Sequence, residues 1–167
     1  MNPNTTAFIK LMKHPLKFRM FLFLKLPSAF FAGVRIKDID EKKCAVTVPY
    51  KWFSQNPFRS TYFACLSMAA EMSTGSLCMA HVYKMKPAIS MLVIKVESEY
   101  FKKATERITF VCEDGEMIEK AIGESIATNE AKMVRARSVG RNKDGGAVAE
   151  FFITWSFKKK SEVRSQR

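Results

Sequence analysis

The stretch from Ser60 to Ala80 constrains the fold most, because it is long, consists of small and apolar residues, and contains a single acid, Glu71. A segment of this kind must be mostly enclosed by protein. Leaving a carboxylate ionised there is costly, so we expect the pKa of Glu71 to be raised. The stretch could also cross a bilayer, but a central acid and its hydroxyl neighbours make insertion into lipid costly. We therefore predict a long helix sheathed by protein.

The length of the chain, 167 residues, allows one domain with a proper core and is too short for two. We assign residues 1–25 to a basic amphipathic helical extension, residues 26–158 to the folded domain, and residues 159–167 to a basic disordered tail. The net charge of +12 is concentrated at the two ends and fits anionic lipid or a phosphate-bearing ligand. The basic residues do not alternate with aromatic residues in a strand motif, and they do not have the pattern of a recognition helix. We therefore expect no nucleic-acid partner.

The N-terminal segment raises the question of targeting, because Phe18 to Leu26 is nearly all apolar. Arg19 and Lys25 leave too short an apolar run for a signal peptide or a membrane span, so we expect a cytoplasmic protein. Pro15 predicts two short helices in place of one. We expect this region to pack on the domain or to make a peripheral contact with an anionic membrane.

Neither a metal nor another cofactor is expected. The two histidines, His14 and His81, are far apart in the sequence and have no partners at ligand spacing. The cysteines also lack metal-ligand spacing and suggest a reducing compartment; they are Cys44, Cys65, Cys78 and Cys112. The chain has no Gly-x-Ser-x-Gly elbow and no phosphate-cradling glycine loop, so a serine or nucleotide hydrolase is not expected.

Alternating apolar residues predict a strand-rich fold around the long helix. Residues 32–49 have the pattern of a hairpin, and residues 49–58 that of a loop. Further strands are predicted at residues 88–101, 107–113, 133–140 and 147–157, with a helical crossover at residues 116–132. We therefore predict an α+β fold in which a long, curved antiparallel sheet wraps around the central helix.

The order of several short motifs supports this prediction. They are Val46-Thr47-Val48-Pro49, the helix entry from Asn56 to Ala64, the acid Glu71, and the strand end Glu99-Tyr100-Phe101-Lys102-Lys103-Ala104. On these residues the chain resembles the hotdog-fold thioesterases, and most of all a thioesterase-like domain family of unknown function found chiefly in bacteria. The resemblance implies a hotdog fold, a homodimer or higher homo-oligomer, and an acyl-CoA or acyl-carrier thioester as ligand.

The resemblance also implies a site. In hotdog thioesterases of the phenylacetate-pathway type, an asparagine precedes a glycine-containing turn, His-Gly-Gly opens the helix, and an acid follows about two turns later. Asn56 and Glu71 keep their places and are the implied catalytic residues, with the acid acting across a dimer seam. Arg59 stands for the turn glycine, and Tyr62-Phe63-Ala64 for His-Gly-Gly. The implied substrate-binding residues are Arg59, Tyr62, Phe63, Ala64, Ser67, Thr74, Lys102 and Lys103.

Physical reasoning on the same residues leaves alternatives open. Backbone N–H groups of Phe63 and Ala64 at the helix start can hold a thioester oxygen. Helical spacing puts Ser67 and Thr74 on the face of Glu71, with Phe63, Leu66, Ala70 and Leu77 on the opposite face, against the sheet.

Each candidate also has a purely structural interpretation. Glu71 can instead be a buried acid satisfied by a neighbour, Asn56 a turn former before Pro57, and Lys102 and Lys103 solvated residues in place of ligands for coenzyme A phosphates. Two functions follow. The chain binds acyl thioesters, with hydrolysis left open, or it is a non-catalytic acyl or lipid-binding module at a membrane surface.

Overall fold

The computed structural model describes residues 2–160 of the chain. The predicted basic tail, residues 159–167, lies almost wholly outside this range. Within the described part, three helices precede the first strand: α1 (Thr5–Lys13), α2 (Pro15–Lys25) and α3 (Pro27–Ala32). The break that Pro15 predicts falls between α1 and α2, whereas the sequence pattern did not indicate α3.

One six-stranded antiparallel sheet follows, in the order β1-β2-β4-β5-β6-β3. Its strands are β1 (Arg35–Ile39), β2 (Cys44–Val48), β3 (Ile89–Tyr100), β4 (Ile108–Cys112), β5 (Lys132–Arg141) and β6 (Ala147–Lys159). The long helix α4 (Phe63–Val82) follows a short 3-10 turn, η1 (Trp52–Ser54), and α5 (Gly115–Thr128) connects β4 to β5. The predicted hairpin, long helix, later strands and crossover helix are all confirmed.

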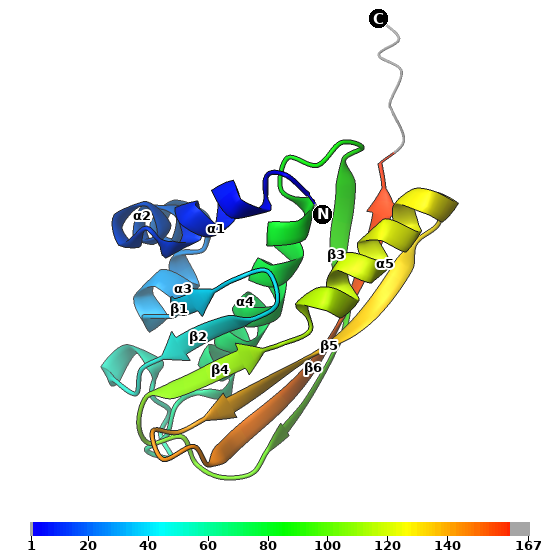
Figure 1. Cartoon of the computed structure of the whole chain (residues 1–167). Coiled ribbons are helices and arrows are strands. Elements are labelled where there is room, and N and C mark those ends of the chain that lie inside the picture. The colour runs from blue at the N-terminus through cyan, green and yellow to red at the C-terminus, as the bar shows by residue number, and fades with distance from the viewer. Residues whose placement is uncertain (1, 161–167) are drawn as a thin grey trace, which may run out of the picture.

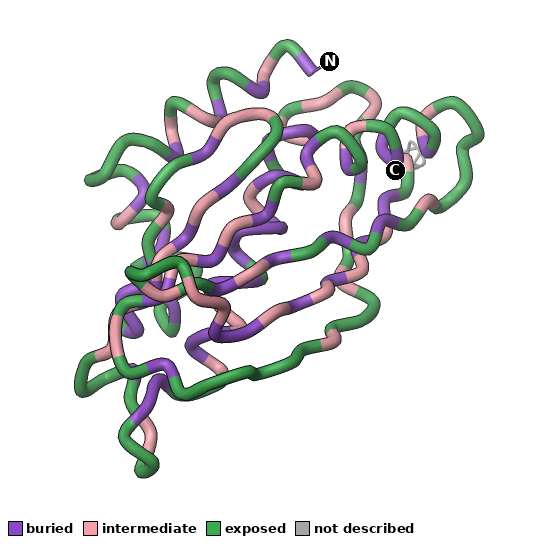
Figure 2. The backbone as a smooth tube through the Cα atoms, turned by 60° about the horizontal axis from the view of Figure 1, so that its bottom comes forward, coloured by how far each residue is buried: buried purple, intermediate pink, exposed green. Residues whose placement is uncertain are grey.

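The sheet curves around α4, as Figure 1 shows. Alternate residues of β2, β4, β5 and β6 are buried and face the helix, and purple segments mark this core in Figure 2. Leu66, Ala70 and Leu77 of α4 pack against the sheet as expected. The α+β prediction of a curved antiparallel sheet around a central helix is therefore confirmed.

Two buried polar contacts join α4 to the sheet. The Ser73 and Ser138 hydroxyl oxygens lie 2.7 Å apart. The Trp155 indole N–H donates to Thr74 Oγ1 at 3.0 Å. All four side chains are buried, where an unpaired polar group would be costly, so each contact ties a fixed position on the helix to a fixed position on the sheet.

The N-terminal helices are attached to the C-terminal end of α4. Asn2 Nδ2 donates to the carbonyl oxygens of His81 and Tyr83 at 3.0 and 2.8 Å, and Thr5 Oγ1 donates to that of Ala80 at 3.0 Å. These contacts satisfy carbonyl groups that a helix end leaves without intrahelical partners. Figure 1 shows α1–α3 together on one side of the molecule and α5 on the other. Among the helices of residues 2–160, none is both long and apolar enough to cross a membrane.

The long strand β3 lies at the edge of the sheet, and among the described strands it pairs with β6 alone. It is largely exposed, and Figure 2 shows it as a mostly green run. Its exposed residues include the apolar side chains of Leu92, Ile94 and Val96. A long apolar edge strand offers a row of unpaired backbone groups to another strand.

Gly115, the first residue of α5, is a position where a side chain does not fit. A Cβ there would overlap the backbone of Glu41 and Lys42 in the β1–β2 turn. We expect Gly115→Ala to lower the free energy of unfolding by about 2–4 kcal/mol, because backbone cannot move aside cheaply. Gly123→Ala in the same helix is the control. Its Cβ meets nothing within 4 Å, so it should stabilise by about 0.5–1 kcal/mol. Urea unfolding measures both, and equal effects of the two changes would contradict this packing.

Candidate active site

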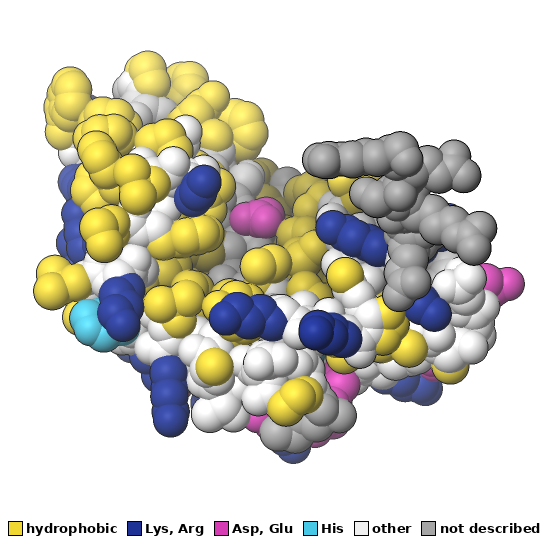
Figure 3. Space-filling model, turned by 90° about the horizontal axis from the view of Figure 1, so that it is seen from above, with side chains coloured by type: hydrophobic (Ala, Val, Ile, Leu, Met, Phe, Trp, Pro, Cys, Tyr) yellow, Lys and Arg dark blue, Asp and Glu magenta, His cyan; other side chains and the backbone are white. Residues whose placement is uncertain are grey.

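Glu71 lies in an apolar cavity of about 620 Å³ between α4, the N-terminal helices and the sheet. Phe18 and Leu22 of α2 form part of its wall, and Met91 and Val93 of β3 and Trp155 of β6 form another part. Among the described residues that line the cavity, Glu71 alone is charged. Figure 3 shows apolar side chains on both sides of a hollow that contains an acidic group.

The Glu71 carboxylate has no hydrogen bond or ion pair with any described residue. Solvent reaches the side chain, but the surrounding apolar atoms displace much of its hydration, and this desolvation raises the pKa of Glu71. Gly75 leaves the room for this arrangement. A Cβ at Gly75 would lie 3.0 Å from Glu71 Oε1 and 3.2 Å from the Trp155 ring. The expected rise in pKa is found, and within residues 2–160 of a single chain Glu71 is an unpaired acid at a cavity wall.

This arrangement predicts a pH-dependent stability. Because the pKa of Glu71 is raised in the folded state, the fold loses stability as the pH rises from the ordinary value of 4.5 through the raised value. Glu71→Gln should therefore raise the Tm at pH 7 and have no effect below pH 4. The rise should be small, about 2 °C or less, because solvent screens the carboxylate. Thermal melts across this pH range test it, with Glu124→Gln at an exposed position on α5 as control. A Tm at pH 7 below that of the wild type would contradict the prediction.

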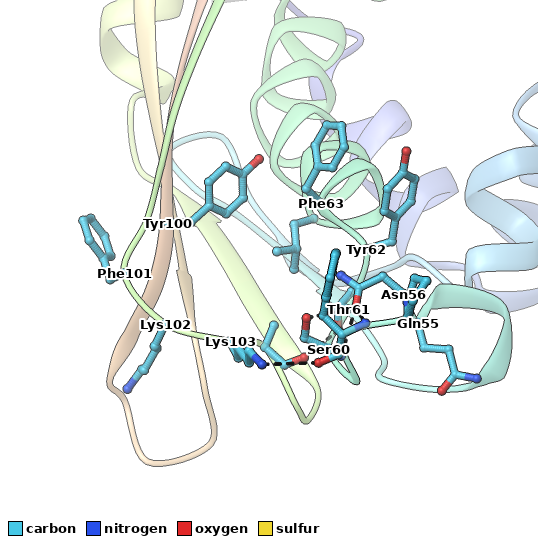
Figure 4. Close-up of a pocket in the computed structure, with 14 residues that line it drawn as sticks. Gln55, Asn56, Ser60, Thr61, Tyr62, Phe63, Tyr100, Phe101, Lys102 and Lys103 are labelled. Atoms are coloured by element: carbon cyan, nitrogen blue, oxygen red, sulfur yellow. Dashed lines mark hydrogen bonds between the residues drawn. The ribbon is translucent and has the colours of Figure 1, made fainter.

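A second cavity, of about 700 Å³, lies at the start of α4. Figure 4 shows it between the Gln55–Phe63 segment and the end of β3. Tyr100 points from β3 towards α4 and Phe63, whereas Phe101 and Lys102 point away to the other side of the strand. The lining contains five of the residues that the sequence suggested: Asn56, Tyr62, Phe63, Lys102 and Lys103.

Asn56 acts as a turn former. Its Oδ1 accepts hydrogen bonds from the backbone N–H groups of Phe58 and Ser60 at 3.0 and 3.2 Å, and from the Ser60 hydroxyl at 3.2 Å. Arg59 within this turn has a φ of 57°, the left-handed conformation that glycine adopts most readily. The turn therefore keeps the backbone shape expected of a glycine although an arginine occupies the position.

The start of α4 presents unpaired backbone donors. Tyr62 caps the helix without a side-chain hydrogen bond, and no acceptor is found within residues 2–160 for the N–H groups of Phe63 and Ala64. The expectation that Phe63 packs against the sheet is wrong, since this residue is 56% exposed. Helical side chains tilt towards the N-terminus, so the ring of the first helical residue extends past the helix start into the second cavity.

The two lysines differ in their placement. Lys103 Nζ donates to the Phe58 carbonyl oxygen at 3.4 Å, which links the strand end to the turn of Asn56. The Lys102 ammonium group instead lies close to Gly146 in the β5–β6 turn. Lys103 is thus at the rim of the second cavity, and the charge of Lys102 is directed away from it.

The remaining suggested residues line neither cavity. The Ser67 hydroxyl donates to the Phe63 carbonyl oxygen at 3.0 Å. Thr74 lies on the buried side of α4, where it contacts Trp155, and does not share the accessible face of Glu71. Asn56 and Glu71, the two suggested catalytic residues, line different cavities of one chain. A single chain therefore does not bring them together.

The sequence did not indicate that the N-terminal helices form a wall of the Glu71 cavity. The available signal was α2 itself, whose apolar residues are spread around the whole helix, so that one set can face inward. Within residues 2–160, no group of three or more metal-ligating side chains comes together. The buried Cys44 and Cys112 are opposite each other on β2 and β4, and burial raises the pKa of the Cys112 thiol to about 12, so it stays protonated and unreactive.

Comparison with known proteins places the chain in a family. The profile described as "Domain of unknown function (DUF4442)" matches residues 16–157. A search of curated proteins finds no match.

Solved structures with the same fold are numerous. A Pseudomonas aeruginosa protein of unknown function, described as a probable thioesterase, has a TM-score of 0.72 at 16% identity, over 96% of this chain and 99% of that one. A Chlorobaculum tepidum protein of unknown function has a TM-score of 0.75 at 16% identity, over 92% and 99%. A Haemophilus influenzae thioesterase has a TM-score of 0.64 at 11% identity, over 87% and 92%. At these identities the likeness shows the fold, and the expected hotdog fold is confirmed.

Proposed function

Because the chain belongs to the DUF4442 family and shares the fold of thioesterases, we propose that it binds acyl thioesters and hydrolyses them with Glu71 as the general base. The observation that supports this most is the unpaired Glu71 carboxylate in an otherwise uncharged cavity. A cavity of about 620 Å³ is in the usual size range for small-molecule sites, and its apolar wall suits an acyl chain.

The raised pKa of Glu71 favours this role, because a base accepts a proton more readily when its pKa lies closer to the working pH. Ionised Glu71 takes a proton from water, and the water oxygen attacks the thioester carbonyl carbon. The carbon–sulfur bond then breaks, and the leaving thiolate receives the proton from Glu71. The products are a carboxylic acid and a free thiol.

The negative charge on the carbonyl oxygen needs hydrogen-bond donors, and besides the paired Trp155 indole the described lining of the Glu71 cavity offers only the Ser76 and Tyr83 hydroxyls. The Phe63 and Ala64 N–H groups are suitable, since they are unpaired and lie at the positive end of the α4 dipole. They lie two turns before Glu71 on the same helix, so a partner chain must supply them.

A homodimer through β3 is our proposal for that partner. Two identical edge strands related by a two-fold axis pair antiparallel. The Tyr100 end of one β3 then lies beside the Ile89 end of the other. Tyr100 lines the cavity at the start of α4, and Met91 lines the Glu71 cavity near the opposite end of the strand. Pairing therefore brings the helix entry of one protomer towards Glu71 of its partner.

A panel of acyl-CoA thioesters of graded chain length tests the function, with release of free thiol as the readout and calorimetric binding alongside. We expect affinity and turnover to rise with chain length, because methylene groups become buried in the apolar cavity. Equal behaviour of acetyl and long-chain thioesters would contradict acyl binding. Binding that depends on chain length but occurs without turnover would contradict hydrolysis and support a role in binding alone.

A further inference from the structure

Helix α2 has apolar residues on two opposite sides. Phe18 and Leu22 are buried and face the domain. On the outside, Leu16 and Leu24 are 75% and 66% exposed, and Met20 is exposed as well. A helix with apolar residues on two opposite sides normally has both sides covered, so the outer side of α2 indicates a missing partner.

Aromatic side chains continue this outer side across α3 and η1. The rings form a row in which neighbouring centroids are 5.2 Å (Phe23–Phe30), 5.3 Å (Phe30–Phe31), 5.6 Å (Phe31–Phe53) and 5.9 Å (Phe53–Trp52) apart. Trp52 at the end of the row is 80% exposed, which is unusual for so large an apolar side chain. We call the exposed set the N-terminal apolar face: Leu16, Met20, Phe23, Leu24, Phe31, Trp52 and Phe53. In Figure 3, apolar side chains crowd the side of the molecule that carries α1–α3.

The segment that contributes most of this face carries charges of one sign. The sequence has no Asp or Glu before Asp38, whereas Lys17, Arg19 and Lys25 of α2 are all basic. The Arg19 guanidinium lies 4.5 Å from the centre of the Phe30 ring, so a cation is built into the aromatic row. Basic residues interleaved with Trp, Phe and Leu are typical of segments that lie in the interface of anionic membranes.

We propose that the N-terminal apolar face is a docking surface for an anionic lipid bilayer, with α2 lying in the headgroup region. A second copy of the chain fits less well, because a two-fold contact would bring like-charged basic residues together. The proposal goes beyond the acyl-thioester function and does not depend on it. It also places α2 between lipid and the Glu71 cavity, since Phe18, Phe21 and Leu22 of this helix form part of the cavity wall.

Flotation of the full-length protein with lipid vesicles tests the proposal. We expect binding to phosphatidylcholine vesicles that contain phosphatidylglycerol, much weaker binding to pure phosphatidylcholine, and loss of binding as salt increases. Lys17→Gln with Lys25→Gln should weaken binding roughly 25-fold, about fivefold for each charge. Leu24→Ser with Trp52→Ser should weaken it by at least about tenfold through lost insertion.

Matched controls separate this surface from general stickiness. Lys120→Gln with Lys143→Gln removes two exposed charges elsewhere, and Met117→Ser with Met133→Ser removes two exposed apolar side chains from α5 and β5. Both controls should bind vesicles like the wild type. Failure of the wild type to bind any vesicle overturns the proposal, and so does equal loss in test and control variants. Light scattering that shows a smaller oligomer only for Leu24→Ser with Trp52→Ser would assign the face to a second copy instead.

Discussion

Replacing Glu71 with Gln should lower the turnover of acyl thioesters by about 10²- to 10⁴-fold, the usual contribution of a general base. Gln keeps the shape and polarity of the side chain but cannot accept the proton. The affinity for the acyl chain should stay within about threefold, because the apolar wall of the cavity is unchanged. In the wild type, kcat should rise with pH through the raised pKa of Glu71 and then level off, since only the carboxylate is a base.

Steady-state kinetics from pH 4 to pH 9 measure these effects. Glu124→Gln is the matched control, because Glu124 is an exposed acid on α5, away from the proposed β3 seam, and lines neither cavity. Hydrolysis that survives Glu71→Gln at the wild-type rate would remove Glu71 as the base. A fall in both affinity and turnover would point to a damaged cavity, which the binding titration and a thermal melt distinguish from lost chemistry.

Changing Ile94 to Lys should convert the proposed dimer to monomers, with a dissociation constant raised by at least about 100-fold. Ile94 is exposed and lies near the middle of the edge strand β3, so in a two-fold pair the two lysines would come close together. Light scattering should give a mass near one chain, 19.1 kDa, in place of twice that mass. Turnover should fall in parallel, because the donors at the start of α4 then have no partner site.

Met133→Lys is the control for Ile94→Lys, since Met133 is also exposed and apolar but lies on β5, inside the sheet. It should leave the mass unchanged. A wild-type protein that is monomeric at micromolar concentration would contradict the shared site, and so would an Ile94→Lys monomer with full turnover.

The fold could be predicted because its signals are local and long. Strands such as β2 alternate strictly between buried and half-buried residues. The stretch that forms α4 consists of small, nearly uncharged residues, and a helix of this composition is expected to be buried against the sheet. Short elements were missed. α3 has six residues and η1 has three, too few for a periodic pattern to show.

The site was harder to predict, because it depends on where side chains point. Spacing placed Thr74 beside Glu71. A three-residue step turns a helix by about 300°, so the two side chains differ by about 60° around the helix axis, and this difference puts Thr74 on the buried side. Lys102 follows the end of β3, where strand alternation no longer fixes direction. The Glu71 cavity depends on α2, which is remote in sequence and whose inner side only the packing reveals.

The two buried contacts of α4 with the sheet also determine which residue faces the cavity. Apolar contacts alone are non-directional, and a helix of small residues in an apolar sheath can turn about its axis at little cost. The Ser73–Ser138 contact and the Trp155–Thr74 hydrogen bond remain intact at one rotation only. A turn of about 100° would bring Ala70 or Met72 to the place of Glu71. Ser73, Thr74 and Ser138, none of which lines the Glu71 cavity, thereby set the angular position of the base together with Trp155, which forms part of the cavity wall.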